Sequence, residues 1–490
     1  MDTQRKNNME AGVTTLLVVA FMGVFTMIMA ALVGYVLEQG RYGRALHARE
    51  EALSIAESGL EYFKWHVAHN EEIREDGTGL QSSYTYTVDD PEGGELGTAN
   101  ITTSANMQCG RVQWIDVESE GTSNSDVRFT RTLAARYMRP SVGEYAFVTD
   151  SGVHYVSNVT GPVHGNSGVR MDGTNNSVVS SKLGEDEFWC TSGYNCNPAQ
   201  WVDGVFGNGS NDDLWSFPVS EINFATMLAD TAPLQGYASA DGLYLSPTQV
   251  YLNGVAQGSA FSSVGGSESR GFHVVFNSNG TVTVRRVTST NSFSSVYDPQ
   301  TGNYITDYPD VANETTVGTY TLPSDCGLIY SEAKTWISGT VSGKITIVAA
   351  DPGSFNPDII LGGTINVSEG NISYATTDGT TGLTAIAEHA VRFANRVPND
   401  MSIRGIFVAQ SGFYGRYFYA FANPSTSYNL RNSLTLNGSI VSKLRAGTAY
   451  GTASGFQNRY TIYDRLQAFD PSAFTPSARV DYGYVLWREE

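Results

Sequence analysis

The chain contains 490 residues, of which 41% are hydrophobic and 11% aromatic, and this excludes a disordered chain or one small disulfide-stapled module. Only 16% of the residues are charged and 51 are glycine, a composition that favours short strands and turns over long charged helices. With 30 basic and 49 acidic residues the formal net charge is −19, which repels nucleic acid. We therefore expect no nucleic-acid partner.

An uncharged apolar run extends from Val13 to Leu37, behind a polar segment of residues 1–12. A helix of this length spans a hydrocarbon core of about 30 Å, and the run is longer than the roughly 7 to 15 apolar residues of a secretory signal. Arg5 and Lys6 favour a cytoplasmic N-terminus. We expect one helix in the cytoplasmic membrane, with the bulk of the chain outside the cytoplasm.

The helical pattern continues beyond this run to about residue 70. Apolar residues recur there with the spacing of one helix face that packs on a neighbour. These residues are Leu46, Leu53, Ala56, Leu60, Phe63 and Val67. Because glycine weakens a helix by roughly 0.5 to 1 kcal/mol relative to alanine, we expect a bend or an extended stretch near Gly34, Gly40 and Gly43.

The leader ending in Gly12, the uncharged helix from Val13 and the segment AREEALSIAESGLEYFKW together resemble the N-terminal region of type IV minor pilins and pseudopilins of the PilX-like kind. The resemblance implies that a prepilin peptidase cleaves between Gly12 and Val13 and removes the leader peptide of residues 1–12. It also implies that the helix of residues 13–70 first lies in the membrane and then packs against other pilin subunits in a filament.

The chain departs from the family pattern at Leu17. Major pilins carry a glutamate at this place, the fifth residue of the mature chain, where it neutralises the terminal amine of a neighbouring subunit. An uncompensated charge in a dry filament core is costly, so the missing glutamate at Leu17 implies a position at or near the tip. Without cleavage or assembly, the chain would be a single-pass signal-anchor protein.

Residues 81–140 have the alternating pattern of four antiparallel strands, separated by turn-rich segments. The strands are expected at 83–88, 98–105, 112–118 and 128–137, and Pro140 closes this unit. The family resemblance implies that this sheet packs on the C-terminal half of the helix.

Residues 143–490 are rich in Gly, Ser, Asn and Thr with short apolar runs. An apolar residue, a glycine two positions later and a β-branched residue two positions after that recur around Gly161, Gly339, Gly363 and Gly438, and the step from Gly339 to Gly363 is the length of one solenoid coil. We predict a β-helix-like solenoid, with a hairpin at 273–284. A β-sandwich with inserts is the alternative. The fold class is thus α+β: a long helix, a small antiparallel sheet and a large all-β domain.

Four cysteines lie in this extracytoplasmic part. Cys190 and Cys196 flank a turn-prone loop, so we expect a local disulfide between them. Cys109 and Cys326 could join the sheet to the solenoid, but the sequence does not choose among the three connectivities. A zinc site is disfavoured because no CxxC pair or nearby histidine accompanies them.

The sequence contains none of the common catalytic or nucleotide-binding motifs. His154, His164 and Asp172 could form an acid–base pair on a solenoid face, but such residues are expected by chance in a region of this composition. We therefore predict no enzyme activity, no cofactor and no metal. A separate aromatic cluster predicts either a buried strand pair or an exposed contact surface. Its residues are Phe413, Tyr414, Tyr417, Phe418 and Tyr419.

Two hypotheses for the function follow. The first is a structural minor pilin-like subunit of a type IV pilus or related filament, displayed at or near the tip on the cell surface and adhesive toward surface glycans. Its partners would be other pilin subunits, the prepilin peptidase and the cytoplasmic membrane before assembly. The alternative is a membrane-anchored surface carbohydrate-active enzyme or glycan-binding module.

Overall fold

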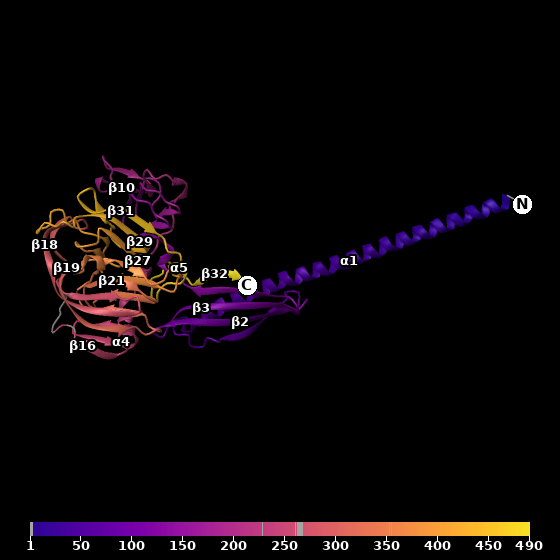
Figure 1. Cartoon of the computed structure of the whole chain (residues 1–490), viewed down its shortest axis with the longest axis horizontal. Helices are drawn as coiled ribbons and strands as arrows, with labels where there is room; N and C mark the ends of the chain where they lie inside the picture. Colours follow the sequence, from indigo (N-terminus) through magenta and orange to yellow (C-terminus); the bar gives the residue numbers. More distant parts are fainter. Residues whose placement is uncertain (1–2, 228, 260, 262–267, 352, 354) are drawn as a thin grey trace.

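The structure is a computed structural model that describes residues 3–490 except 228, 260, 262–267, 352 and 354, and the side chains from residue 13 onward apart from those and residue 226. Figure 1 shows a long N-terminal helix, a small sheet beside its C-terminal half, and a large β-rich body at the end opposite the N-terminus. The fold is therefore α+β, as predicted.

Helix α1 (Thr3–His69) is continuous and is followed by the short helix α2 (Glu71–Glu75). The predicted extended stretch is wrong, because Gly34, Gly40 and Gly43 all lie within α1. A glycine lowers helix stability but keeps its backbone N–H, and α1 contains no proline that would interrupt the hydrogen-bond ladder.

The small sheet contains the four predicted strands and a fifth from the C-terminus. Its antiparallel order is β1 (Ser83–Asp89), β2 (Glu95–Gln108), β3 (Arg111–Ser123), β4 (Thr130–Met138) and β32 (Gly483–Glu489). Tyr484 pairs with Tyr137, and Arg131 forms an ion pair with Glu489. The assignment of all of 143–490 to the large domain is therefore wrong at its end, and the body is an insertion between β4 and β32.

The C-terminal half of α1 packs on this sheet. Its buried apolar residues are Ala48, Ala52, Ile55, Ala56, Leu60, Phe63 and Val67. Of the predicted stripe, Leu46 is exposed and Leu53 only half-buried, because the stripe drifts onto the alanine side of the helix. A Cβ atom on Gly121 of β3 would lie 2.0 Å from the carbonyl oxygen of Ala52, so the close approach of helix and strand requires glycine there.

Two long ladders of parallel strands form the framework of the body, whereas a β-sandwich is built from antiparallel pairs. The first ladder, all parallel, runs in the order β14 (Leu243–Leu245), β20 (Leu328–Ser331), β22 (Lys344–Ala349), β25 (Gly382–Ala387), β27 (Asp400–Ala409), β29 (Leu430–Ser442), β5 (Phe147–Thr149), β7 (Val163–Gly165), β9 (Val179–Ser181) and β13 (Trp215–Ser216). The second runs in the order β17 (Gly271–Phe276), β21 (Thr335–Val341), β23 (Ile359–Leu361), β26 (Val391–Phe393) and β28 (Tyr414–Gly415).

The order of strands in the first ladder differs from the order in the chain. The chain enters in the middle at β5, builds one end of the ladder up to β13, crosses to the opposite end and returns from β14 to β29. Ile440 of β29 then pairs with Phe147 of β5 and joins the two segments. In Figure 1 the magenta segment that includes β10 (Phe188–Cys190) therefore lies at the end of the body opposite β16 (Val255–Ser259).

The predicted coil length and hairpin are present. Thr335, Trp336 and Ile337 of β21 pair in parallel with the residues 24 positions later in β23. The four glycines of the recurring pattern all have positive φ, with 105° at Gly339 and 141° at Gly438, where a side chain would strain the backbone. The hairpin pairs β17 with β18 (Thr281–Asp298), and β18 pairs on with β19 (Asn303–Thr321).

Shorter elements complete the body. A third parallel group contains β6 (Val153–Tyr155), β8 (Val169–Met171) and β12 (Val205–Phe206), and β10 pairs with β11 (Gln200–Val202). The remaining strands are β15 (Gln249–Leu252), β24 (Ile372–Tyr374), β30 (Ala449–Tyr450) and β31 (Ser454–Ile462). The helices are α3 (Phe224–Met227), α4 (Thr231–Asp241) and α5 (Leu466–Phe469), with 3-10 turns at Val142–Glu144, Ser192–Tyr194, Asp212–Leu214 and Val367–Gly370.

The main core lies between the two ladders, and a second core lies between the first ladder and α4. Ile347 and Phe407 of the first ladder join Ile337 and Phe393 of the second in the main core. Val348 and Ile386 of the first ladder face the second core. Because the strands of the first ladder are buried on both faces, their sequences are continuous apolar runs rather than alternating patterns.

A buried ionic network ties the long hairpin β18–β19 to the second ladder. The Arg392 side chain donates from Nε to Asp358 at 2.5 Å and from Nη1 to both carboxylate oxygens of Asp307 at 3.1 Å. Tyr419 donates to Asp307 at 2.5 Å, and His389 lies 2.7 Å from Asp358. Burial would raise the pKa of both carboxyl groups, but the charge of Arg392 outweighs it, and both pKa values lie below the ordinary value.

Candidate functional site

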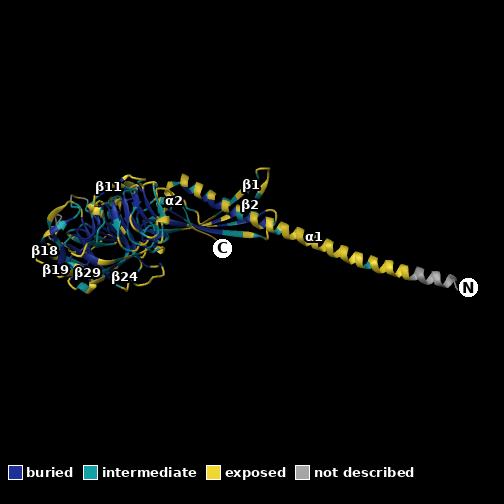
Figure 2. Ribbon diagram, turned by 90° about the horizontal axis from the view of Figure 1, so that it is seen from above, coloured by how far each residue is buried: buried dark blue, intermediate teal, exposed yellow. Residues whose placement is uncertain are grey.

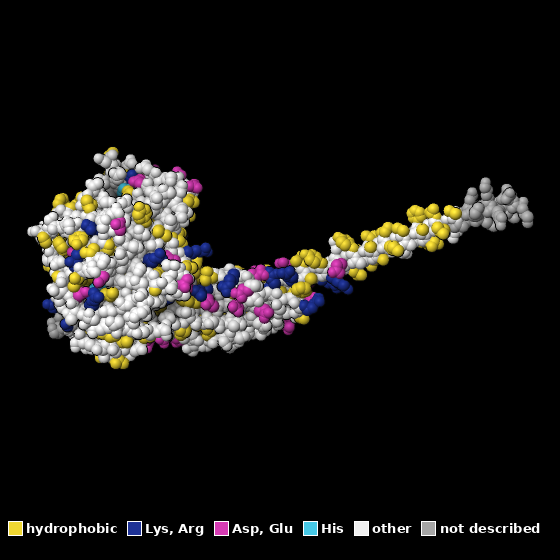
Figure 3. Space-filling model, in the orientation of Figure 1, with side chains coloured by type: hydrophobic (Ala, Val, Ile, Leu, Met, Phe, Trp, Pro, Cys, Tyr) yellow, Lys and Arg dark blue, Asp and Glu magenta, His cyan; other side chains and the backbone are white. Residues whose placement is uncertain are grey.

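The exposed apolar surface of α1 is the first candidate site; we call its residues from Val13 to Leu37 the assembly surface. They are not packed against any other element of the described residues, and Figures 2 and 3 show this part of the helix exposed and apolar. The exposed large apolar side chains are Val13, Leu16, Leu17, Val18, Val19, Phe21, Met22, Val24, Phe25, Met27, Ile28, Met29, Leu32, Val33, Tyr35, Val36 and Leu37. Among the described residues, one helix segment, Val13–His69, is long and apolar enough to cross a membrane.

The predicted processing residues lie at the start of this surface. The Gly12–Val13 bond is inside α1, and the Val13 side chain is 65% exposed. Leu17 is 52% exposed. The first charged side chains after the run, Glu38 and Arg41, lie 3.7 Å apart and mark its end.

A carboxylate of α1 contacts the small sheet near the start of their shared interface. Glu51 accepts hydrogen bonds from Ser123 and, at 2.6 Å, from Ser125. These two hydrogen bonds hold the pKa of Glu51 below its ordinary value against the opposing effect of burial.

The second candidate site is a cavity of about 600 Å³ in the body, which we call the body cavity. It lies between β6, the loop closed by Cys190 and Cys196, and residues 445–461. Its polar and aromatic lining residues are Phe147, His154, Tyr155, Ser157, Tyr297, Gln300, Tyr414, Arg445, Thr448, Tyr450, Phe456, Gln457, Arg459, Tyr460 and Thr461.

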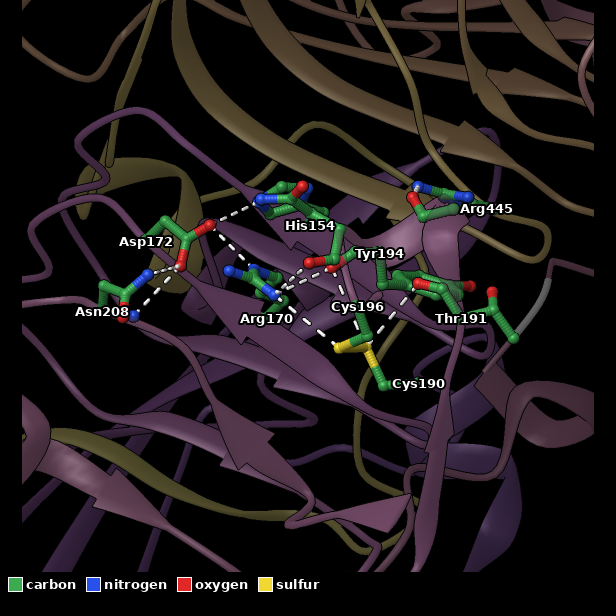
Figure 4. Close-up of a disulfide and its surroundings, with 11 residues drawn as sticks. His154, Arg170, Asp172, Cys190, Thr191, Tyr194, Cys196, Asn208 and Arg445 are labelled. Atoms are coloured by element: carbon green, nitrogen blue, oxygen red, sulfur yellow. Dashed lines mark hydrogen bonds and ion pairs between the residues drawn. A yellow bond between two sulfur atoms is a disulfide. The ribbon is translucent and has the colours of Figure 1, made fainter. Parts of the chain in front are cut away.

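The predicted local disulfide closes the loop that forms one wall of this cavity. Cys190 and Cys196 are bonded, with their Cα atoms 5.7 Å apart. Gly193 in this loop lines the cavity; its carbonyl accepts a 2.5 Å hydrogen bond from Arg445, whose guanidinium lies 4.1 Å from the ring centre of Tyr194. Figure 4 shows Arg445 beside the Tyr194 side of the loop. The disulfide thus fixes the shape of the wall.

Cys109 and Cys326 form the second disulfide, with 4.5 Å between their Cα atoms. It joins the β2–β3 hairpin of the small sheet to the segment that precedes β20 in the body. The Cys109 backbone N–H also donates to the carbonyl of Asp325 at 2.6 Å. This crosslink therefore attaches the body to the small sheet at a point distant in sequence from β4 and β32.

The residues considered as an acid–base pair are only partly brought together. His154 lies 2.7 Å from Asp172, which also accepts from Arg170 at 2.8 Å (Figure 4). His164 lies apart in β7, where it is buried and bonded to Ser180 and Asn166.

The charge states of the contacting pair follow from their surroundings. Burial lowers the pKa of His154, although the hydrogen bond to Asp172 opposes this effect. Burial would raise the pKa of Asp172, but the hydrogen bonds from Arg170, His154 and Asn208 outweigh it, and the pKa lies below its ordinary value. Asp172 is therefore an ionised acceptor that several donors hold in place.

The exposed contact surface predicted at the aromatic cluster is wrong. Phe413, Tyr414, Tyr417 and Tyr419 are at most 8% exposed, and Phe418 is half-buried. The cluster packs against the β18–β19 hairpin, with Phe293 6.1 Å from Tyr419 between ring centres. Transfer of aromatic rings from water into such a core is favourable. The observed arrangement is therefore the alternative prediction, a buried packing role.

Sequence reasoning missed most residues of the body cavity. Tyr155, Tyr450 and Arg459 carry no local motif, and nearly 300 residues separate the first from the other two. They meet only because β31 pairs with β29, which in turn pairs with β5.

Comparison with known proteins gives little further guidance. No family model and no curated protein matches the chain. Among solved structures, the chain is similar to the competence-associated pilin ComZ from Thermus thermophilus, with 12% identity over 90% of this chain and 97% of that chain and a TM-score of 0.31. At this level the similarity supports no conclusion about the function of this chain.

Proposed function

We propose that the chain is a minor pilin-like subunit of a type IV pilus or related filament. The observation that carries the proposal is the assembly surface: residues 13–37 of a continuous helix are apolar on all sides, and their side chains are not packed against any other described element. A surface of this kind must be covered by lipid or by other apolar helices. The same helix ends in a buried docking to the small sheet, so a subunit held by the helix carries the body rigidly with it.

The membrane is the first environment of this helix and the filament the second. Before assembly the helix lies in the cytoplasmic membrane with the body outside the cytoplasm. A prepilin peptidase then cleaves between Gly12 and Val13, and sister subunits replace the lipid around the assembly surface. In this proposal the body has no catalytic role and holds no cofactor.

The residue at position 17 favours the tip. The described part of the assembly surface contains no carboxylate that could neutralise the terminal amine of a neighbour. A subunit of this kind is a poor repeating unit, because an unpaired charge in the filament core is costly. At the tip, no further subunit packs on one face of this helix, so one of these unfavourable contacts is not formed.

Mass spectrometry of the mature N-terminus tests the processing step. Chains from cells with the peptidase should begin at Val13, and chains from cells without it at Met1. Gly12→Leu should block trimming, whereas Gly23→Leu, a matched change in the same helix where an added Cβ meets nothing within 4 Å, should not. A chain that begins at Met1 in both backgrounds would refute the pilin proposal.

Filament imaging with a label on the body tests the position. Label at filament ends supports the tip, and label along the shaft contradicts it.

The body cavity favours a second candidate function, a membrane-anchored glycan-binding module. It is compatible with the first, because a body displayed at a tip can act as an adhesin. A carbohydrate-active enzyme would instead require that an acid and a base act on one bond, and His154→Ala in a polysaccharide cleavage assay tests that alternative.

A further inference from the structure

The body cavity has a charge opposite to that of the chain as a whole. Its described lining contains Arg445, Arg459 and His154 and no carboxylate, although the chain has 49 acidic and 30 basic residues. Two acidic side chains adjoin lining residues, but both are engaged elsewhere. Asp172 is held by Arg170 and His154, and Asp298 accepts from the backbone of Gln300 and the hydroxyl of Thr301. A negative ligand would therefore meet little repulsion.

Arg459 is a half-buried cation without a counter-charge. Its side chain makes no hydrogen bond or ion pair with the described residues, and burial lowers its pKa while nearby Tyr155 opposes this. A guanidinium that has lost part of its hydration gains free energy from a bound acceptor, so its placement suits an anion supplied from outside. Arg445 donates to the carbonyl of Gly193 and keeps other N–H groups for a second acceptor.

A third arginine lies behind the wall. Arg416 is fully buried, forms no ion pair with the described residues, and lies 5.8 Å from the ring centre of Phe456, which lines the cavity. Its Nη2 donates to the carbonyls of Asn395 and Tyr428 at 2.8 Å each. Its charge adds to the positive potential of the cavity.

The remaining lining suits a ring with hydroxyl groups. Tyr155, Tyr297 and Tyr460 supply aromatic faces against which the C–H face of a pyranose can pack. The hydroxyl of Tyr414, a lining residue that is 2% exposed, has no hydrogen-bond partner among the described residues. A buried unpaired hydroxyl is unfavourable and would gain a partner in a ligand hydroxyl.

We propose that the body cavity binds an acidic saccharide, with its carboxylate paired to Arg459 and Arg445 and its rings against the tyrosine side chains. A cavity of about 600 Å³ accommodates a short oligosaccharide. The inference rests on the proposed display of the body outside the cell, and it names the ligand class of the adhesive role.

Calorimetric titration of the full chain in detergent micelles tests this inference with three probes. These are a galacturonate trimer, its fully methyl-esterified form, which has the same rings without charge, and a short single-stranded oligonucleotide. We expect the acid to bind and the ester to bind at least roughly tenfold more weakly, because hydrogen bonds to a charged group are lost. Arg459→Gln should weaken the acid by a similar factor, and Arg128→Gln, the same change at an exposed site on the small sheet, should not.

Tyr414→Phe provides a second variant that removes one oxygen atom, and we expect about two- to tenfold weaker binding of the acid. Thermal unfolding of each variant shows whether it is folded. Equal binding of acid and ester, tighter binding of the oligonucleotide, unchanged binding in folded Arg459→Gln, or no binding by the wild type would each overturn the inference. The N-terminus of chains prepared from cells that contain the peptidase separates the two proposals. Uronate binding by chains that keep Met1 in these cells refutes the pilin assignment alone, and correct trimming without uronate binding refutes this inference alone.

Discussion

Replacement of Arg392 by methionine should destabilise the body strongly, because this one side chain forms ion pairs with two buried carboxylates. Asp307 and Asp358 are 4% and 6% exposed, and Arg392 is 2% exposed. In the variant Asp307 keeps the Tyr419 hydroxyl and Asp358 keeps His389 and a backbone N–H, but neither keeps the guanidinium. Removal of one partner of a buried ion pair typically costs about 3 to 5 kcal/mol. We expect a loss in this range at pH 7, a large part of the roughly 5 to 15 kcal/mol that stabilises a domain.

The loss should depend on pH in a defined direction. In the wild type both pKa values lie below the ordinary value, so the network stabilises the fold above about pH 4, and this contribution is lost as the pH falls further. Without the guanidinium, burial dominates and the folded-state pKa values of the carboxyl groups rise above about 4. The variant then loses stability as the pH rises. The difference between wild type and variant should therefore be smallest near pH 3.5 and largest near pH 7.

Chemical unfolding of a fragment from residue 44 onward measures this difference, because the described side chains of residues 13–43 are not packed against the small sheet or the body. Circular dichroism at pH 3.5, 5 and 7 gives the free energy of unfolding at each pH. Arg128→Met is the matched control: this arginine pairs with Asp126 at 2.6 Å, but its side chain is 80% exposed, and we expect an unchanged unfolding midpoint. A difference below about 1 kcal/mol at pH 7, or one that does not shrink on acidification, would refute the reasoning.

Three further predictions concern the joints of the molecule. Gly121→Ala should lower stability by about 1 to 3 kcal/mol, since its Cβ would lie 2.0 Å from the Ala52 carbonyl; an unchanged melting temperature would contradict the close helix–strand contact. Replacement of Cys109 and Cys326 by serine should reduce stability by up to about 5 kcal/mol, because the bond closes a loop across a sequence separation of 217; equal denaturant midpoints for the variant and the oxidised wild type would argue against this. Glu51, whose pKa is lowered, stabilises the helix–sheet contact above about pH 4 and less as the pH falls, so Glu51→Gln should flatten the acid limb of the stability profile; an unaltered limb would exclude this role.

The sequence predicted those features whose signals are local. The apolar run from Val13, the four alternating strands and the 24-residue step are all patterns within one segment, and each is present in the structure. The disulfide between Cys190 and Cys196 could be predicted for the same reason, since only a turn-prone loop of five residues separates the two cysteines.

Features that depend on distant pairing could not be predicted in this way. The sequence of the last strand, β32, does not indicate which strand it pairs with, because its partner β4 lies more than 340 residues earlier. The same limit applies to the body cavity, where Arg459 meets Tyr155 only through the order of strands in the first ladder. The prediction for the aromatic cluster failed for a different reason. The sequence around Tyr419 is the same whether the side chain is exposed or buried, and only its contacts with Asp307 and Phe293 show that it is buried.

The insertion of the body between β4 and β32 has a mechanical consequence. A pull on the body reaches the small sheet through three covalent connections: the chain leaving β4, the chain entering β32 and the bond between Cys109 and Cys326. Because these three share the tension, the body cannot swing on a single tether, and no single strand must bear the whole force. A torque applied at the far end of the body is therefore transmitted through the small sheet to the long helix.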